Sequence, residues 1–128
     1  MQAVCGIAHK DGKVLICKRP EGVSYPGYWE FPTELLRFDE TLEDALERGF
    51  FDRLGVVPER EIGIFAENSA EFPEIRMFAY LVPAKNFEVH LNGYSNRKWV
   101  NVNELTKFRL ISPCVTFVNI VKKNIKSL

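Results

Sequence analysis

Apolar and polar positions along the chain predict a series of short strands. Residues 3–8 and 13–19 are apolar runs, and Asp11-Gly12 between them is a dipeptide typical of tight hairpin turns. Residues 20–28 carry two prolines and two glycines and are expected to form a loop. Four further apolar stretches predict strands over 29–31, 61–66, 75–82 and 97–102.

A different period marks the helices. Between residues 42 and 54 the apolar positions recur at spacings of three and four, as on one face of a helix. Thr41 and Asp44 are placed to form a capping box, and Gly55 stands where a helix commonly ends. A second amphipathic helix is expected over 115–125. The order of elements predicts an α+β or α/β domain in which a mixed sheet lies between helices.

Length and composition restrict the class of protein. The chain has 128 residues with 46% hydrophobic and 27% charged residues, which suits one globular domain over 1–128. No apolar run is long enough to span a membrane, and the first residues do not resemble a signal peptide. The three cysteines lie far apart without metal-ligand spacing, which favours a reducing compartment and a cytoplasmic location.

The net charge of zero conceals an uneven distribution. Residues 97–128 hold seven basic side chains and one acidic one, whereas an acidic segment covers 34–53. No aromatic residues are interleaved with the basic ones, so we expect solvated surfaces, and the basic segment is only weak evidence for a nucleic-acid partner.

One segment resembles a known family. Residues 29–32 read Trp-Glu-Phe-Pro, Glu40 precedes Thr41 at the helix start, and Arg48 follows Glu40 by eight positions. With Gly55 and Val56, these residues resemble the Nudix box of MutT-like proteins, G-x5-E-x7-R-E-U-x-E-E-x-G-U preceded by W/L-E-F-P-G-G. Segments around Arg19, Trp99 and Ser112 agree, so the resemblance covers essentially the whole chain. It implies a Nudix fold and hydrolysis of phosphoanhydride bonds in nucleoside di- or triphosphates.

The departures from the pattern lie on the predicted helix and just before it. The glycine pair of the family is Thr33-Glu34 here, and three glutamates of the box are Gly49, Asp52 and Arg53. In the family this helix face binds Mg²⁺ or Mn²⁺, and positions 49, 52 and 53 share one face. One carboxylate and one guanidinium now replace three carboxylates, and Arg53 would repel a cation. We therefore expect family-like metal binding to be lost or weakened.

The resemblance also assigns roles to individual residues. It implies that Glu40, Arg48 and Asp52 belong to the catalytic set, with Glu40–Arg48 expected to be a salt bridge, and that Asp52 is the remaining metal ligand. It further implies that Arg19, Phe31, Arg53 and Ser112 contact the substrate.

Three of the positions on and around this site allow a second interpretation. Phe31 could belong to the core. Arg53 could bind phosphate without metal, or pair with Asp52 or Asp39, or be solvated. Gly49 could be a remnant of lost function, or could let a ligand approach the helix backbone.

These observations support two main hypotheses about function. One is a Nudix hydrolase with weak, altered or absent hydrolysis. The alternative is a catalytically silent Nudix module that binds a nucleotide or another protein. A third, regulatory association with nucleic acid through the basic C-terminal helix, is less favoured. A homodimer would be in keeping with the resemblance.

Overall fold

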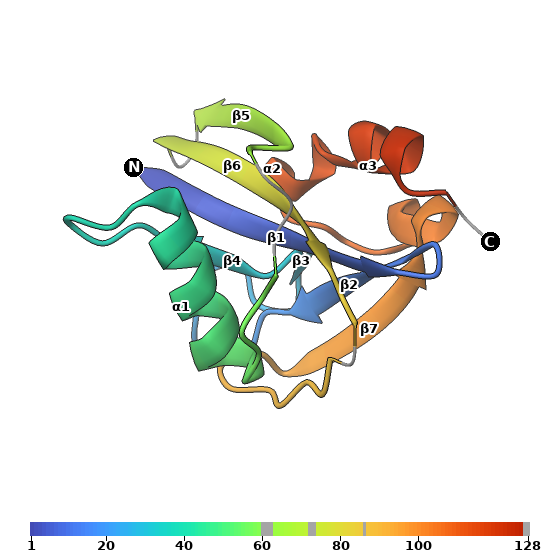
Figure 1. The fold of residues 1–128 in the computed structure, drawn as a ribbon, viewed down its shortest axis with the longest axis horizontal. Helices are drawn as coiled ribbons and strands as arrows, with labels where there is room; N and C mark the ends of the chain where they lie inside the picture. The colour runs from blue at the N-terminus through green and yellow to red at the C-terminus, as the bar shows by residue number, and fades with distance from the viewer. Residues whose placement is uncertain (60–62, 72–73, 86, 127–128) are drawn as a thin grey trace.

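The computed structural model describes residues 1–59, 63–71, 74–85 and 87–126, which form a mixed sheet between two groups of helices (Figure 1). The strands are β1 (Gln2–Lys10), β2 (Lys13–Lys18), β3 (Trp29–Glu30), β4 (Thr33–Leu35), β5 (Ala66–Glu71), β6 (Glu74–Pro83) and β7 (Asn96–Asn101). The helices are α1 (Leu42–Leu54), the 3₁₀ helix η1 (Val102–Lys107), α2 (Ser112–Val115) and α3 (Val118–Asn124).

The sheet is mixed, as the sequence predicted. Its order is β3-β2-β1-β6-β5 among the described residues, with β4 paired to β1 and β7 paired to β2. β1 and β6 run parallel, and the other pairs are antiparallel. The expected hairpin between β1 and β2 is confirmed, and Asp11 and Gly12 both take the positive φ angles that such a turn requires.

Helices cover both faces of the sheet, and each face has its own hydrophobic core (Figure 1). On one face α1 buries Leu46, Phe50 and Leu54 against β1 and β6. The close approach depends on Gly6 in β1, because a Cβ there would lie 2.4 Å from the ring of Phe50. On the opposite face, η1, α2 and α3 contribute Leu105, Cys114 and Val121 to the second core, together with Phe117 from the link between α2 and α3.

The first helix follows the sequence expectation closely. Thr41 is its N-cap, and the capping box with Asp44 is present in both directions. Gly55 ends the helix in the left-handed conformation with φ 69°, and its N–H bonds to the carbonyls of Phe50 and Phe51. The helix packs against β4, where Gly49 of α1 lies next to the side chain of Glu34.

Two expectations are wrong in detail, and one strand was not expected. Of the strand expected over 61–66, residues 61–62 lie outside the described part, and β5 starts only at Ala66. The helix expected over 115–125 is divided into α2 and α3, with Thr116 and Phe117 between them. The Thr116 hydroxyl donates to the Pro113 carbonyl at 2.9 Å, a local bond that competes with regular helix. Strand β4 was not anticipated at all.

Candidate functional site

An ion pair ties the loop before α1 to the middle of the helix. Arg48 donates through Nε to Glu40 Oε2 at 2.8 Å and through Nη2 to Glu40 Oε1 at 2.9 Å. The same Nη2 donates to the carbonyl of Leu35 at 2.9 Å. The hydrogen bond from Arg48 is the main cause that lowers the pKa of Glu40 to about 2 from an ordinary 4.5. The expected Glu40–Arg48 salt bridge is therefore confirmed.

Glu34 on β4 is the second centre of charge. Arg53 Nε donates to Glu34 Oε2 at 3.0 Å, and Arg48 Nη1 lies 3.5 Å from Glu34 Oε1. The sequence suggested Asp52 or Asp39 as the partner of Arg53. Both suggestions are wrong, because the guanidinium pairs with Glu34. The side chain of Glu34 is 15% exposed and that of Arg53 is 34% exposed. The guanidinium thus stays partly open to solvent while it neutralises Glu34.

Gly49 lies directly beneath Glu34. It is buried, and the three atoms nearest to a Cβ built on it all belong to the Glu34 side chain. The space that a side chain at position 49 would take is therefore occupied by the Glu34 side chain from β4. The sequence analysis identified Glu34 only as a departure from the family's glycine pair and did not connect it with Gly49.

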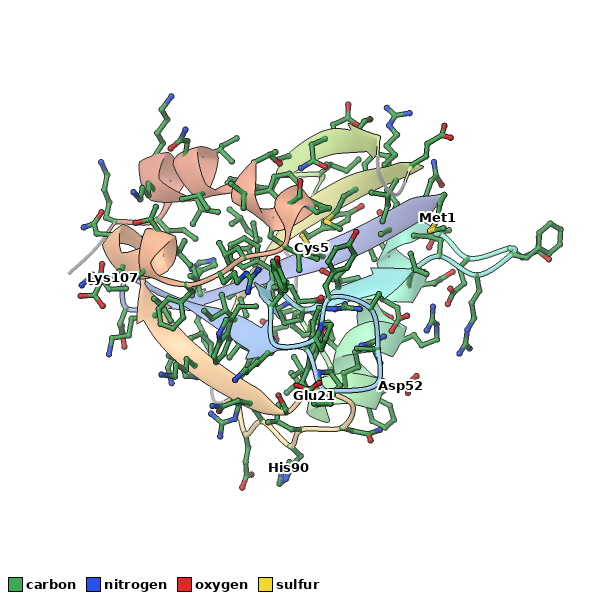
Figure 2. All side chains as sticks on the ribbon, turned by 180° about the vertical axis from the view of Figure 1, so that it is seen from behind. Met1, Cys5, Glu21, Asp52, His90 and Lys107 are labelled. Carbon is green, nitrogen blue, oxygen red and sulfur yellow. The ribbon has the colours of Figure 1, made fainter. Side chains whose placement is uncertain are left out.

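Asp52 is the one acid that remains at the three box positions 49, 52 and 53. Its side chain is exposed on the outer surface of α1, whereas Cys5 lies at the centre of the sheet (Figure 2). The described residues contain no group of three His, Cys, Asp or Glu side chains able to hold a metal ion. With Gly49 on the same helix face and the neighbouring Arg53 cationic, this donor set does not fit a Mg²⁺ or Mn²⁺ site of the family type.

The buried carboxylate of Glu30 extends the network through Tyr94, which lies next to Arg53. Glu30 on β3 is 1% exposed, accepts from Arg19 Nη1 at 2.6 Å and accepts from the Tyr94 hydroxyl at 2.8 Å. Burial raises the pKa of Tyr94 well above its ordinary 10.0, so the hydroxyl remains a donor. The Arg53 guanidinium stacks on the Tyr94 ring, with Cζ 5.4 Å from the centroid. The charged groups therefore alternate in sign from Arg19 through Glu30 to Arg53 and Glu34.

Two members of this network were missed by sequence reasoning. Glu30 lies in the Trp-Glu-Phe-Pro run, which was used as a family marker without a role for its acid. Tyr94 lies in a polar loop, and its hydroxyl meets Glu30 across 64 positions of sequence. Only the presence of a lone acid in an otherwise apolar strand could have indicated Glu30.

The residues expected to contact substrate have different surroundings in the structure, and Arg19 and Arg53 both belong to the network described above. Arg19 is held by Glu30 and by Ser24, whose carbonyl accepts from Arg19 Nε at 2.7 Å. Phe31 has no exposed surface and belongs to the core, which favours the core alternative. Ser112 is exposed at the start of α2, just after Ile111, whose N–H bonds to the Trp29 carbonyl at 2.9 Å.

A separate cavity of about 510 Å³ lies beyond the C-terminal end of α1. Its lining includes Gly55, Phe87 and His90 and shares no residue with the network around Glu34. It therefore adds nothing to the chemistry of the helix face.

The fold, a sheet covered on both faces by helices with the loop–helix segment 34–56 beside β1, defines the Nudix class. The profile of the NUDIX domain matches residues 3–119, and the chain belongs to the Nudix hydrolase family. Family members generally use divalent metals. None of the described helices is long and apolar enough to cross a membrane.

Relatives agree with this assignment. The chain is 26% identical to the CTP pyrophosphohydrolase of Escherichia coli K12 over 113 residues, which cover 86% of this chain and 82% of that protein. The solution structure of the E. coli ORF135 protein superposes with a TM-score of 0.81 at 23% identity, covering 92% of this chain and 85% of the other. The MutT protein of Methanosarcina mazei Go1 reaches 0.82 at 18% identity, covering 98% and 95%. The two structures show that the fold is the same.

Proposed function

We propose that this protein binds a nucleotide through its phosphate groups without a divalent metal, and hydrolyses phosphoanhydride bonds slowly or not at all. The observation that carries the proposal is the helix face itself, where Gly49, the exposed Asp52 and the paired Arg53 replace a carboxylate cluster. The resemblance to a CTP pyrophosphohydrolase supports a nucleoside phosphate as the ligand class.

Electrostatics favours an anion over a cation at this place. A divalent ion close to Arg53 would meet repulsion of about 4 kcal/mol for each unit of charge at 4 Å and an effective dielectric near 20. The same guanidinium attracts phosphate, for which arginine is the preferred side chain because its planar donors match two oxygens. Arg53 keeps a third of its surface open, so it has donors left for a ligand besides the one used on Glu34.

The far end of the ligand is proposed to meet Arg19 and Ser112, as the family resemblance implies. Arg19 is 21% exposed and held in place by Glu30. The Ser112 hydroxyl can donate one hydrogen bond and accept others but cannot make the two-point contact of an amide, so weak base selectivity is expected. The three cysteines are free and buried, which is in keeping with a cytoplasmic site of action.

The test is calorimetric titration with CTP, dCTP, ADP-ribose and pyrophosphate, first in EDTA and then with millimolar MgCl₂ or MnCl₂. Release of phosphate and pyrophosphate is followed in the same solutions. We expect binding of equal affinity with and without metal, and no metal-dependent release. Arg53→Gln should weaken binding at least tenfold.

Arg76→Gln is the matched control, because Arg76 also pairs with a glutamate, Glu67, but is exposed on the sheet formed by β5 and β6. This variant should bind as the natural protein does. Metal-dependent hydrolysis by the natural protein, or binding that is unaffected by Arg53→Gln, would contradict the proposal.

A further inference from the structure

Glu34 of β4 and Gly49 of α1 occupy one small volume. A Cβ on residue 49 would lie 2.8 Å from Glu34 Cβ and 3.2 Å from Glu34 Cγ. A contact of 2.8 Å is closer than Cβ atoms approach, and Glu34 Cβ is bonded directly to the strand backbone. It cannot rotate away as the end of a flexible side chain can. A side chain at position 49 therefore requires β4 and α1 to move apart.

The carboxylate that packs over Gly49 is neutralised by neighbouring guanidinium groups. The carboxylate of Glu34 extends over Gly49 and is held by Arg53 at 3.0 Å, with Arg48 at 3.5 Å. Arg53 is itself fixed against the ring of Tyr94. A glutamate at position 34 without the cation at 53 would leave a half-buried carboxylate poorly neutralised, and an arginine at 53 without Glu34 would lose its closest anion.

We infer that positions 34, 49 and 53 are a single coupled set. Glu34 fills the space of a side chain on residue 49, and Arg53 neutralises the carboxylate that this arrangement brings onto the helix. The set closes this face of α1 to divalent cations. Introducing acids at 49 and 53 alone does not reopen it, because position 34 still carries a Cβ. The inference holds whether or not the protein binds nucleotide.

The steric part of the inference is tested by one substitution in three backgrounds. The quantity compared is whether the substitution raises or lowers the thermal midpoint of unfolding. Gly49→Ala is made in the natural chain, with Glu34→Ala and with Glu34→Gly, and thermal midpoints are measured. We expect it to lower the midpoint in the first two backgrounds, where the Cβ of residue 34 remains. With Glu34→Gly the contact is gone, and alanine should raise the midpoint by about 4 °C, as it does inside helices generally. An increase of the same size in all three backgrounds would overturn the inference.

The electrostatic half is tested with Mn²⁺ alone as the probe. The variants are Gly49→Glu/Arg53→Glu and Glu34→Gly/Gly49→Glu/Arg53→Glu, with Glu34→Gly as the control. Bound Mn²⁺ is read from the loss of the free-ion paramagnetic resonance signal and from the midpoint shift at millimolar MnCl₂. We expect the triple variant to bind and the double variant and control not to. A double variant that binds as tightly as the triple one, or a triple variant that does not bind, would refute the coupling.

Discussion

The buried bond between Tyr94 and Glu30 offers the sharpest test of the network behind the helix face. Tyr94→Phe removes only the hydroxyl, which donates to Glu30 Oε2 at 2.8 Å and accepts from the Thr33 N–H at 3.3 Å. The aromatic ring is kept, so its stacking with Arg53 is retained. The substitution therefore removes one donor from a carboxylate that is 1% exposed, and the longer contact with the Thr33 N–H is lost with it.

The magnitude follows from leaving a buried charged acceptor without one of its two donors. A hydrogen bond to a charged group contributes about 1.5–3 kcal/mol, and water cannot reach Glu30 to replace it. We expect a loss of about 2 kcal/mol in the free energy of unfolding. Unfolding entropy for a chain of 128 residues is about 0.27 kcal/mol per kelvin, so the midpoint should fall by about 7 °C.

The assay is urea and thermal unfolding followed by circular dichroism, with Tyr25→Phe as the matched control. Tyr25 is 49% exposed, so the same loss of a hydroxyl should change stability by less than about 0.5 kcal/mol. Equal effects of the two substitutions, or a Tyr94→Phe variant as stable as the natural protein, would refute the claim that the Glu30 contact stabilises the fold.

Three further predictions follow from the same structure. The pKa of Glu40 is lowered from 4.5 to about 2, so its ion pair stabilises the fold above pH 4.5, and this contribution is lost on acidification towards pH 2. The midpoint gap between the natural protein and Glu40→Gln should therefore shrink over that range in a pH series of melts, and a constant gap would contradict it. Burial raises the pKa of all three cysteine thiols, so a water-soluble disulfide reagent should label none in the folded protein and three in urea. Asp52→Asn should leave both the melting midpoint and the proposed nucleotide affinity unchanged, and a loss of affinity in the titration would assign Asp52 a role.

Much of the fold could be predicted because local signals agree with the global packing. The first helix is marked at both ends by Thr41 and Gly55, and the apolar period between them faces the sheet. Strands β4 and β5 lacked such signals. The first has three residues, too few for a period, and β5 is largely polar and is positioned by its backbone ladder to β6. Sequence periodicity does not record backbone pairing of this kind.

The same distinction separates the predicted from the missed parts of the site. Glu40 and Arg48 were paired correctly because they lie on consecutive segments at a spacing that the family pattern retains. Glu34 and Arg53 are 19 positions apart, and their contact exists only because β4 packs on α1 at the level of Gly49. A long-range contact through an unanticipated strand gives no signal in the order of residues.

Taken one at a time, the departures at positions 34, 49 and 53 resemble the decay of a metal site. Random loss of acids on a helix would leave a cavity or an unpaired charge, and each would destabilise the domain. Among the described residues at this place, the gap beside Gly49 is too small for a water molecule, and the buried carboxylate is paired. The space above Gly49 is filled, and Glu34 lies between two guanidiniums. Because the replaced positions compensate one another in both volume and charge, the helix face is better explained as a remodelled surface that keeps its stability without metal than as a damaged active site.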